Sequence, residues 1–265
     1  MRDFMNHQPT LLDDTDRFKH SSNIITNKVL EKFEETFSDE KAGSMLDIGA
    51  GNGILIALIR QKYKNFKFQA VDYVDNLLEI TDVPLDVVNL NETALPYNNE
   101  SFDFVSIAEV IEHLENPRGT LREISRVLKP GGRVVITTPN VLNLKSRLMF
   151  LFTGFHNLFG PLTVNPINKH STHGHITPIG YFYLSHALAE SGFTNIEFDI
   201  DKKQSWAYLP SIVLAPLISI LGNLSFRRQR KKKFMNETND RLCRPINTLK
   251  MLYGRTVVVT ASKAK

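Results

Sequence analysis

The chain has 265 residues, 42% of them hydrophobic, which is enough to bury a full core. Its formal charge is +4, but six of the seven residues 227–233 are basic, and without that run acidic residues outnumber basic ones. The pI of about 9.0 therefore indicates a local patch and excludes a generally basic surface. A single cysteine, Cys243, excludes an internal disulfide framework. Because the polar N-terminus also shows no signal-peptide core, we expect a cytoplasmic protein.

Helices and strands are expected to alternate along most of the chain. The first 21 residues look irregular, and a charged amphipathic helix over 23–37 is expected to cover the mouth of the site. The next strands are expected at 44–49, 67–72, 85–89, 102–108 and 132–138. Helices are expected at 53–63, 75–80 and 117–128, with Gly131-Gly132 ending the last of these, and at 177–191, where Thr177-Pro178 provides a cap.

Two further strands are expected at 195–200 and 255–260. The strands before them are nearly all apolar, as buried parallel strands are. Alternation of such strands with helices indicates an α/β protein with helices on both faces of a parallel sheet.

The segment after the first strand contains glycine at 49, 51 and 53, followed at once by an apolar helix. Glycines at this spacing let backbone approach a bound molecule, and the helix N-terminus behind them carries free N–H groups and partial positive charge. This pattern predicts a nucleotide site. The loop is no Walker A, and it lacks the third glycine of the dinucleotide fingerprint, so a dehydrogenase-type turn is the weaker interpretation.

The loop and the motifs after it resemble one enzyme family in order and spacing. Asp47-Ile-Gly-Ala-Gly-Asn-Gly53 resembles motif I of the class I S-adenosylmethionine-dependent methyltransferases. The motifs that agree downstream are Asp72, Asn89-Leu90-Asn91, Leu95-Pro96-Tyr97, Ser101-Phe102-Asp103, Glu109-Val-Ile-Glu-His-Leu114, Leu128-Lys-Pro-Gly-Gly-Arg133 and Thr138-Pro139-Asn140. The resemblance covers residue 44 to about residue 140. It implies a Rossmann-like, doubly wound, mostly parallel seven-stranded sheet with one antiparallel strand, plus α-helical additions.

The resemblance also implies the residues that bind the cofactor, S-adenosyl-L-methionine. Gly49, Gly51 and Gly53 are expected to let the loop pass under its methionine and ribose parts, with Asp47 orienting the loop or reaching the amino group through water. Asp72 is expected to accept hydrogen bonds from the ribose hydroxyls. Asn89 and Leu90 are expected to flank the adenine; many relatives have aspartate where Asn89 stands. Glu109 is expected to face the methionine end. Ordinary strand-end polarity is the alternative for Asp72 and Asn89.

The segment Glu109-Val-Ile-Glu-His113 carries the candidate catalytic residues Glu112 and His113. A similar Glu-x-x-Glu-His with a later histidine holds a divalent ion in small-RNA 2′-O-methyltransferases and some ubiquinone-pathway O-methyltransferases. Here His175 is the best match for that histidine, and His173 is second. The candidate ligands of such an ion, for example Mg²⁺, are therefore Glu109, Glu112, His113 and His175. The alternatives are a histidine that acts as general base or positions the loop, and a purely structural role.

Two apolar segments are expected to be additions on the acceptor side, 143–176 and 205–253. The resulting division of the chain is 1–43 as an N-terminal arm and cap helix, 44–142 as the cofactor-binding core, 143–176 and 205–253 as insertions, 177–204 as a core helix and strand, and 254–265 as the final strand and tail.

Residues 205–226 contain no charge and run directly into the basic residues 227–233. Pro210, Pro216 and Gly222 are expected to break this segment into shorter pieces, which argues against a membrane span. One interpretation is a hydrophobic helical hairpin packed on the core, with a solvated basic loop. The other is an element that lies in the interface of an anionic membrane, peripheral to its inner face.

These features predict a methyltransferase that acts on an oxygen of a hydrophobic or membrane-proximal small molecule, lipid or glycan. An RNA 2′-O-methyltransferase, with the basic run binding phosphates, is the alternative within the same class. A cofactor-binding scaffold without catalysis is the alternative from another class, although Asp47, Gly49, Gly51 and Asp72 are intact.

Overall fold

The computed structural model describes residues 12–38, 41–162, 174–233 and 235–265, with side chains from residue 23 onward. Its centre is a seven-stranded sheet with the order β3-β2-β1-β4-β5-β7-β6. The strands are β1 (Gly43–Ile48), β2 (Phe66–Asp72), β3 (Leu85–Val87), β4 (Phe102–Ala108), β5 (Leu128–Pro139), β6 (Phe193–Ile200) and β7 (Thr256–Lys263). Only β7 runs antiparallel to its neighbours. The predicted fold class, with one antiparallel strand, is therefore confirmed.

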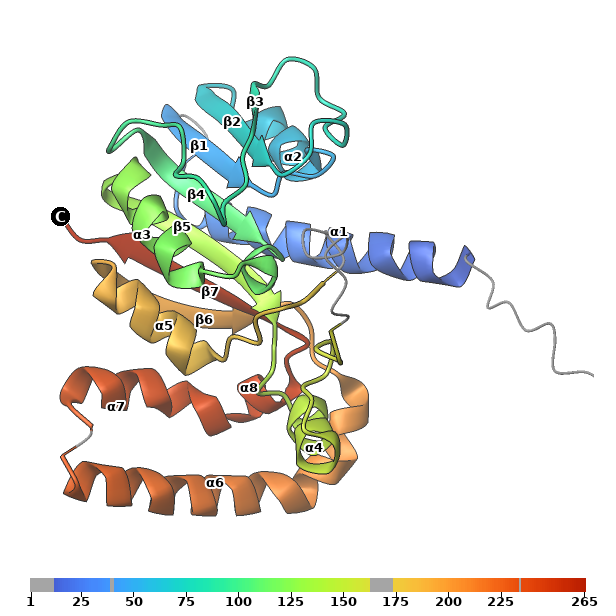
Figure 1. Cartoon of the computed structure of the whole chain (residues 1–265), viewed down its shortest axis with the longest axis vertical. Helices are drawn as coiled ribbons and strands as arrows, with labels where there is room; N and C mark the ends of the chain where they lie inside the picture. The colour runs from blue at the N-terminus through green and yellow to red at the C-terminus, as the bar shows by residue number, and fades with distance from the viewer. Residues whose placement is uncertain (1–11, 39–40, 163–173, 234) are drawn as a thin grey trace, which may run out of the picture.

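Helices cover both faces of this sheet, as Figure 1 shows. Helices α3 (Pro117–Val127) and α5 (Tyr181–Glu190) pack on one face, and α1 (Leu12–Glu34) and α2 (Ile54–Lys62) pack on the other. The remaining helices, α4 (Leu144–Thr153), α6 (Tyr208–Lys231), α7 (Glu237–Cys243) and α8 (Leu249–Tyr253), lie at the lower end of the molecule in this view, beyond β6.

Helix α1 is longer than the sequence predicted, and its described side chains contribute to the core. Phe33 is fully buried and contacts Phe37, Phe66 and Phe104 with ring centroids 4.9–5.0 Å apart. This aromatic cluster fixes the C-terminal half of α1 against the sheet, because edge-to-face packing of buried rings is both apolar and specific.

Three predictions about helices were wrong, each for a local reason. Residues 75–80 form no helix, because Leu78 and Ile80 pack over the glycine loop beside Gly53 and Glu79 donates its N–H to Asn52. Gly131-Gly132 does not end α3, which stops at Val127; it lies in β5, where the pairing with β4 shifts register.

Helix α5 begins at Tyr181 rather than at 177. The reason is that Ile176 and Thr177 donate their N–H groups to the carbonyl of Glu112, at 3.0 and 2.9 Å, and the Thr177 hydroxyl donates to the carbonyl of Leu114. Thr177 therefore closes a loop against the β4 end of the sheet instead of capping a helix.

The apolar segment after β6 was expected to be broken by proline, and this was also wrong. Residues 208–231 form one continuous helix, α6, with Pro216 inside it. Pro210 lies in the first turn, where a proline costs no hydrogen bond, and Pro216 removes a single one without ending the helix.

The junction of α1, β6 and α8 is held by one carboxylate. Asp199 on β6 binds the Lys250 ammonium at 2.6 Å and the Lys28 ammonium at 2.8 Å. Burial alone raises the pKa of this carboxyl, but the hydrogen bonds from Lys250 and Lys28 outweigh that effect and hold the pKa well below its ordinary value. Ionised Asp199 therefore stabilises the folded state.

We expect Asp199→Asn to lower the free energy of unfolding by about 1–2 kcal/mol at pH 7, because two charge-assisted bonds are lost at a partly exposed site. A depressed pKa gives stability that is present above the unfolded-state value of about 3.9 and is lost as the pH falls below it. Denaturation at pH 7 and pH 3 should therefore show a smaller difference between variant and wild type at pH 3. Asp82→Asn, at an exposed ion pair, is the control. An equal or larger difference at pH 3 contradicts this assignment.

Candidate active site

The loop between β1 and α2 is shaped by three glycines in the left-handed region, with φ of 73° at Gly49, 54° at Gly51 and 81° at Gly53. A Cβ on Gly49 would lie 2.1 Å from Val110, and one on Gly53 would lie 2.7 Å from Ile80. Nothing lies within 4 Å of the corresponding position on Gly51. The loop is thus packed at both ends and borders open space in the middle, where its backbone is accessible to a ligand.

Asp72, the last residue of β2, lies beside this opening. Its Oδ2 accepts the N–H of Gly51 at 2.8 Å, and its Oδ1 accepts the N–H of Tyr73 at 2.7 Å. The carboxylate therefore holds the middle of the glycine loop and lies where a ligand over Gly51 would meet it.

Asp47 lies behind the loop and is buried. The Ser106 hydroxyl on β4 donates to its Oδ1 at 2.6 Å. Burial raises the pKa of Asp47 to about 7, against the lowering effect of the Ser106 bond and with a smaller upward contribution from Asp72. A cation bound nearby would favour the ionised form.

Asn89 and Leu90 follow β3 and are partly buried. The Asn89 side-chain oxygen accepts the N–H of Asn91 at 3.1 Å, so it closes a local turn. Leu90 packs against the main core.

On the other side of Gly49, β4 ends at a bend of the chain. Glu109 has a φ of 55°, and the Thr137 hydroxyl on β5 donates to its carboxylate at 2.9 Å. Burial raises the pKa of Glu109 to about 7, the Thr137 bond opposes this, and the charge of Asp201 adds to it. The carboxylate is thereby turned toward β5.

Glu112 is fully buried in the 3-10 helix η1 (Ile111–His113). Thr138 donates to its Oε2 at 3.1 Å, whereas its Oε1 is buried without a hydrogen-bond partner among the described residues. Burial, together with the charge of Glu109, raises the pKa of Glu112 well above its ordinary value. A buried, unsatisfied carboxylate oxygen marks a position where a proton, a cation or a donor is required.

His113 and His175 meet at this point, although 62 positions separate them in the sequence. Their ring centroids are 4.8 Å apart in an edge arrangement. Nδ1 of His113 lies 2.9 Å from the carbonyl of Gly174, and Nδ1 of His175 lies 3.1 Å from that of Leu158. A carbonyl only accepts, so both neutral rings carry their proton on Nδ1 and have the lone pair on Nε2. Burial lowers the pKa of His175, and the charge of His113 lowers it further.

Glu112, His113 and His175 form a group whose ligand atoms all lie within 4.8 Å of one another. Glu109 is not part of it, because its carboxylate is bonded to Thr137. His173 lies outside the described residues. The structure thus brings together three of the four candidate ligands.

Several residues of the site were missed at the sequence level: Ser106, Thr137, Thr138, Phe159, and the carbonyls of Leu158 and Gly174. Ser106 and Thr137 were predictable in principle, because the parallel register places Ser106 opposite Asp47 and Thr137 opposite Ala108, whereas Thr138 stood only in a family motif with no role assigned. The two carbonyls come from the 143–176 segment, for which the sequence offers no pairing rule.

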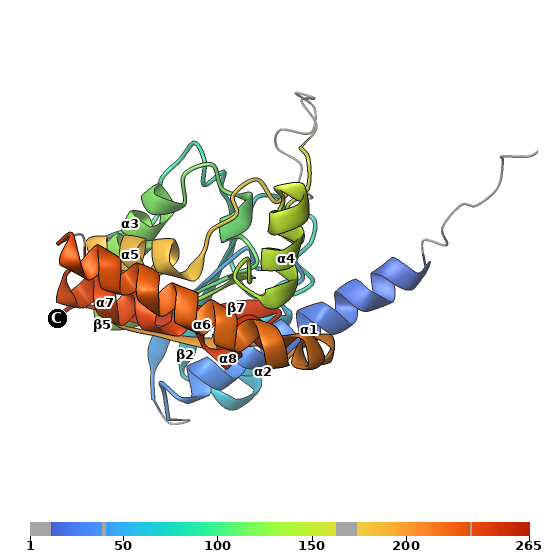
Figure 2. The same cartoon turned by 90° about the horizontal axis from the view of Figure 1, so that it is seen from below.

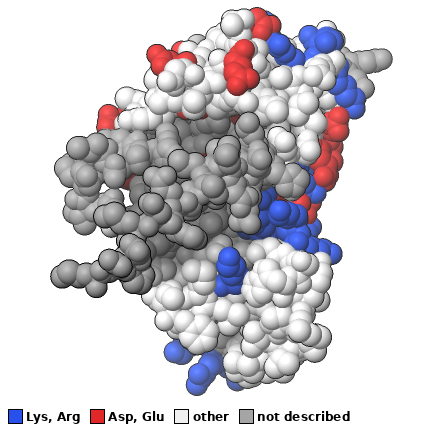
Figure 3. Space-filling view, turned by 90° about the vertical axis from the view of Figure 1, so that its right-hand side faces the viewer, with Lys and Arg blue, Asp and Glu red and all other residues white. Residues whose placement is uncertain are grey.

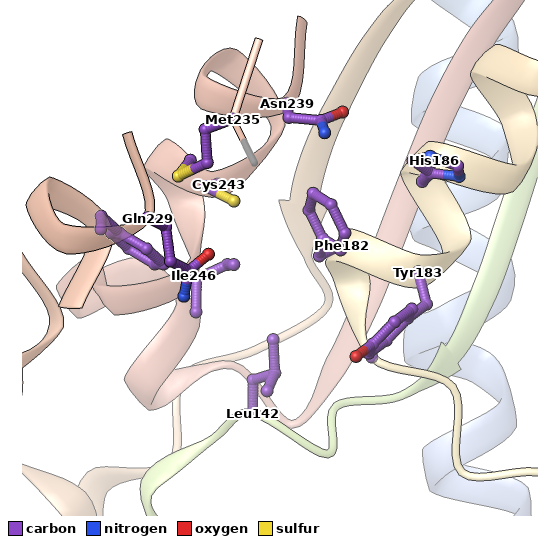
Figure 4. Close-up of a pocket in the computed structure, with 11 residues that line it drawn as sticks. Leu142, Phe182, Tyr183, His186, Gln229, Met235, Asn239, Cys243 and Ile246 are labelled. Atoms are coloured by element: carbon purple, nitrogen blue, oxygen red, sulfur yellow. The ribbon is translucent and has the colours of Figure 1, made fainter. Parts of the chain in front are cut away.

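A concavity lies away from these groups, between α5, α6 and α7. Its volume is about 460 Å³, and Figure 4 shows Phe182 and Tyr183 of α5 on one side and Met235, Cys243 and Ile246 on the other. None of the carboxylates or histidines described above lines it. The carboxyl edge of β1, β2 and β4 is therefore the better candidate for the chemistry.

Residues 22–198 match the family model of a methyltransferase domain, which is more than half of the chain. The chain belongs to the class I S-adenosylmethionine-dependent methyltransferases. It is 30% identical to a ubiquinone biosynthesis O-methyltransferase of Aliivibrio fischeri, over 65% of this chain and 74% of that protein. It is 29% identical to a ubiquinone/menaquinone biosynthesis C-methyltransferase of Desulfotalea psychrophila, over 46% of this chain, and this match spans only 51% of the Desulfotalea protein.

Solved structures show the same fold. An S-adenosylmethionine-dependent methyltransferase from Archaeoglobus fulgidus superposes with a TM-score of 0.58 at 16% identity, covering 96% of this chain and all of the other. Phosphoethanolamine N-methyltransferase 2 of Haemonchus contortus, in complex with S-adenosyl-L-methionine, gives a TM-score of 0.52 at 19% identity, over 90% of this chain and 53% of the other.

S-adenosylmethionine is thus the cofactor of this family, and the glycine loop fits it. The cofactor carries a sulfonium and an ammonium, and the loop offers open space at Gly51 beside the carboxylate of Asp72, with the buried Asp47 behind it. A buried carboxyl whose pKa is near 7 becomes ionised when a cation binds beside it.

Asp72→Asn should weaken S-adenosylmethionine binding by roughly 1.5–3 kcal/mol, because it removes a charged acceptor beside the loop and loosens the hold on Gly51. Isothermal titration calorimetry measures this change. Asp82→Asn, in the loop before β3 where Asp82 pairs with Arg60 of α2, should bind the cofactor as wild type does. Unchanged affinity in a folded Asp72→Asn protein would remove this residue from the site.

Proposed function

We propose that this protein transfers the methyl group of S-adenosylmethionine to an oxygen of a small, hydrophobic, quinone-type acceptor. The observation that carries the proposal is the pair of histidines beside a buried carboxylate, at the carboxyl edge of the sheet and against an apolar wall. Phe159 forms part of that wall, with its ring 5.2 Å from that of His175. The names of the Aliivibrio and Desulfotalea relatives support an acceptor of this class.

The histidines fit the removal of a hydroxyl proton. When bound, S-adenosylmethionine supplies a methyl group attached to a positively charged sulfur, which leaves as a neutral thioether. As the new O–C bond forms, the acceptor oxygen must lose its proton, and a neutral imidazole with its lone pair on Nε2 accepts it. Gly174 and Leu158 hold both rings in this tautomer. The apolar wall excludes water that would compete for the methyl group.

A metal-assisted version uses the same three residues. Glu112 Oε1, His113 and His175 would hold a divalent cation, which lowers the pKa of a bound hydroxyl. Two imidazoles and one carboxylate suit Zn²⁺, Mn²⁺ or Fe²⁺ better than Mg²⁺, which prefers oxygen ligands. Of these ions, Mg²⁺ is therefore the least favoured by the donor set.

The RNA alternative is less favoured. The basic run lies at the C-terminal end of α6, whereas the histidines lie at the carboxyl edge of the parallel strands, on the other side of the molecule in Figures 1 and 2. Phosphates bound at the run would therefore not place a ribose at the site.

The test is methyl transfer from labelled S-adenosylmethionine to polyprenylated phenols and catechols, with the product mapped by mass spectrometry. We expect an O-methyl ether. A methyl group on a ring carbon would indicate C-methylation, as in the name of the Desulfotalea relative, and would refute methyl transfer to oxygen. No transfer to any member of the series, with cofactor binding intact, would refute the acceptor class.

His113→Gln and His175→Gln should each lower turnover by about 10²–10⁴-fold with little effect on cofactor affinity, because the base is lost and the loop is not. His186→Gln, on α5, is the matched control.

If histidine is the base, EDTA should have no effect, and activity should rise with pH around an apparent pKa below about 6.5, since burial lowers that of His175. Loss of turnover in EDTA with recovery in Mn²⁺ or Zn²⁺ selects the metal version. Full activity in both variants contradicts each account.

A further inference from the structure

Helix α6 exposes large apolar side chains that a helix packed on a core would bury. Its only buried residue is Ser211, whose hydroxyl lies 2.6 Å from that of Tyr253 on α8. Gly222 lies so close to Asn247 that a Cβ there would be 2.1 Å from the Asn247 side-chain nitrogen. The face that meets the protein thus combines small and polar residues with the partly buried Leu214, Ile218 and Phe226.

Most of the large apolar residues of α6 point the other way. Leu209 and Val213 are 78% and 72% exposed, and only 11% of the most apolar 18-residue stretch of this helix is buried. The exposed residues recur after three or four positions, twice as adjacent pairs, so they form one continuous face: Leu209, Ile212, Val213, Leu217, Ile220, Leu221 and Leu224. Of the described helices, α6 is the one long and apolar enough to cross a membrane by length and composition.

The same face continues into positive charge. Arg227 and Lys231 follow Ile220 and Leu224 by seven residues each, so they extend the apolar stripe toward the helix end. Helix α6 contains no acidic residue. Arg230 is different, because it pairs with Asp240 and ties the helix end to α7. The outward face thus combines a long apolar stripe with exposed cations at one end.

Helix α4 adds a second exposed apolar surface beside the first part of α6, as Figures 1 and 2 show. The exposed large apolar residues in and after α4 include Phe150, Leu151, Phe152, Phe155 and Leu158. Arg147 of α4 bonds to Ile246 and Asn247, the segment that α6 also packs on. In Figure 3 the lower part of the molecule, outside the grey residues, shows Lys and Arg but no Asp or Glu.

This surface leads directly to the histidines. Leu158 is exposed on the apolar side, and its carbonyl bonds to His175. Phe159, the next residue, is buried against the same ring. An acceptor dissolved in an apolar phase that covers α4 would therefore reach the candidate active site without crossing water.

We propose that α6 and α4 dock this protein on an anionic lipid bilayer, with α6 lying in the plane between headgroups and acyl chains. Apolar side chains enter the boundary, and Arg227 and its basic neighbours bind lipid phosphates. A span is disfavoured because both ends of the segment return to adjacent strands, β6 and β7, of one sheet. A contact with a second copy of α6 would offer these cations no anionic partner, because the helix contains no acidic residue. This inference rests on the proposed function in one respect: docking would supply the enzyme with a lipophilic acceptor.

The experiment uses the full chain with vesicles of phosphatidylcholine alone or mixed with phosphatidylglycerol. We expect sedimentation with the mixed vesicles at low salt, weakening as salt rises. The single tryptophan, Trp206, lies immediately before α6 and is partly exposed, so its fluorescence should shift to the blue on binding. Release by an alkaline wash is expected of a docked helix, whereas resistance to that wash would indicate a span and overturn the proposal.

Two sets of variants separate the contributions. Leu209→Gln with Val213→Gln changes exposed side chains and should lower vesicle binding by roughly tenfold or more, while Val87→Gln, at an exposed position of β3, should not. Replacing Arg227, Arg228, Lys231, Lys232 and Lys233 by glutamine, with Arg230 kept, should remove the preference for anionic vesicles.

Cofactor affinity, measured in parallel by calorimetry, should stay at the wild-type value in every one of these variants. Absence of vesicle binding in wild type with intact cofactor affinity overturns this inference and leaves the proposed function standing. A concentration-dependent dimer in place of vesicle binding, lost in the Leu209 and Val213 variant, assigns the surface to a second copy and also overturns it.

Discussion

The parallel register of β1 and β4 is the constraint on which the site depends. It places Asp47 opposite Ser106, and the buried bond between them, 2.6 Å long, joins the two strands one residue before β1 ends and two before β4 ends. The glycine loop that leaves β1 and the bend that leaves β4 must then lie side by side. They are in contact, because Gly49 leaves room for Val110 where any other residue would collide with it. One hydrogen bond and one missing Cβ thus put the cofactor loop beside the histidine group.

The same region concentrates carboxyl groups that burial disfavours in their charged form. Asp47 and Glu109 have pKa values raised to about 7, and burial raises the pKa of Glu112 well above its ordinary value. Each therefore destabilises the fold when it ionises alone, and each is stabilised by a nearby cation. A cationic cofactor over the loop and a cation or proton at Glu112 would supply that charge. Part of the free energy of binding a cationic ligand here would therefore come from the ionisation of these carboxyl groups.

The antiparallel strand β7 explains why the additions lie outside the sheet. It pairs with both β5 and β6, so the chain that leaves β6 must return to the next position in the sheet. The bridge between Lys203 and Gly254, with bonds from Gln204 to Tyr253 and from Arg255 to Lys202, closes the base of the excursion. Within this excursion α8 belongs to the core through Met251 and Leu252, whereas α6 buries only Ser211. A helix such as α6 can therefore present its apolar face outward at no cost to the sheet.

The strands and the cofactor loop were predictable from the sequence, because buried parallel strands are short apolar runs and Asp47 to Gly53 follows one directly. The helices were less so. Leu78 and Ile80 suggested a helix, but they bind the glycine loop, a contact that no local pattern encodes. Pro216 suggested a break, but one lost hydrogen bond does not end a helix of 24 residues. The approach of His113 and His175 was suggested by a resemblance; their tautomers depend on carbonyls of Gly174 and Leu158, which only the three-dimensional fold places.

The central claim is that the glycine loop and the β4 bend form one ligand site. Hydrogen–deuterium exchange with and without S-adenosylhomocysteine, the product form of the cofactor, tests it most directly. We predict slower exchange in the peptides that contain residues 47–55, 72–74 and 109–114, together, and little change in α6 and α7. Protection confined to the cavity between α5, α6 and α7, or protection of the glycine loop without the β4 bend, would contradict it.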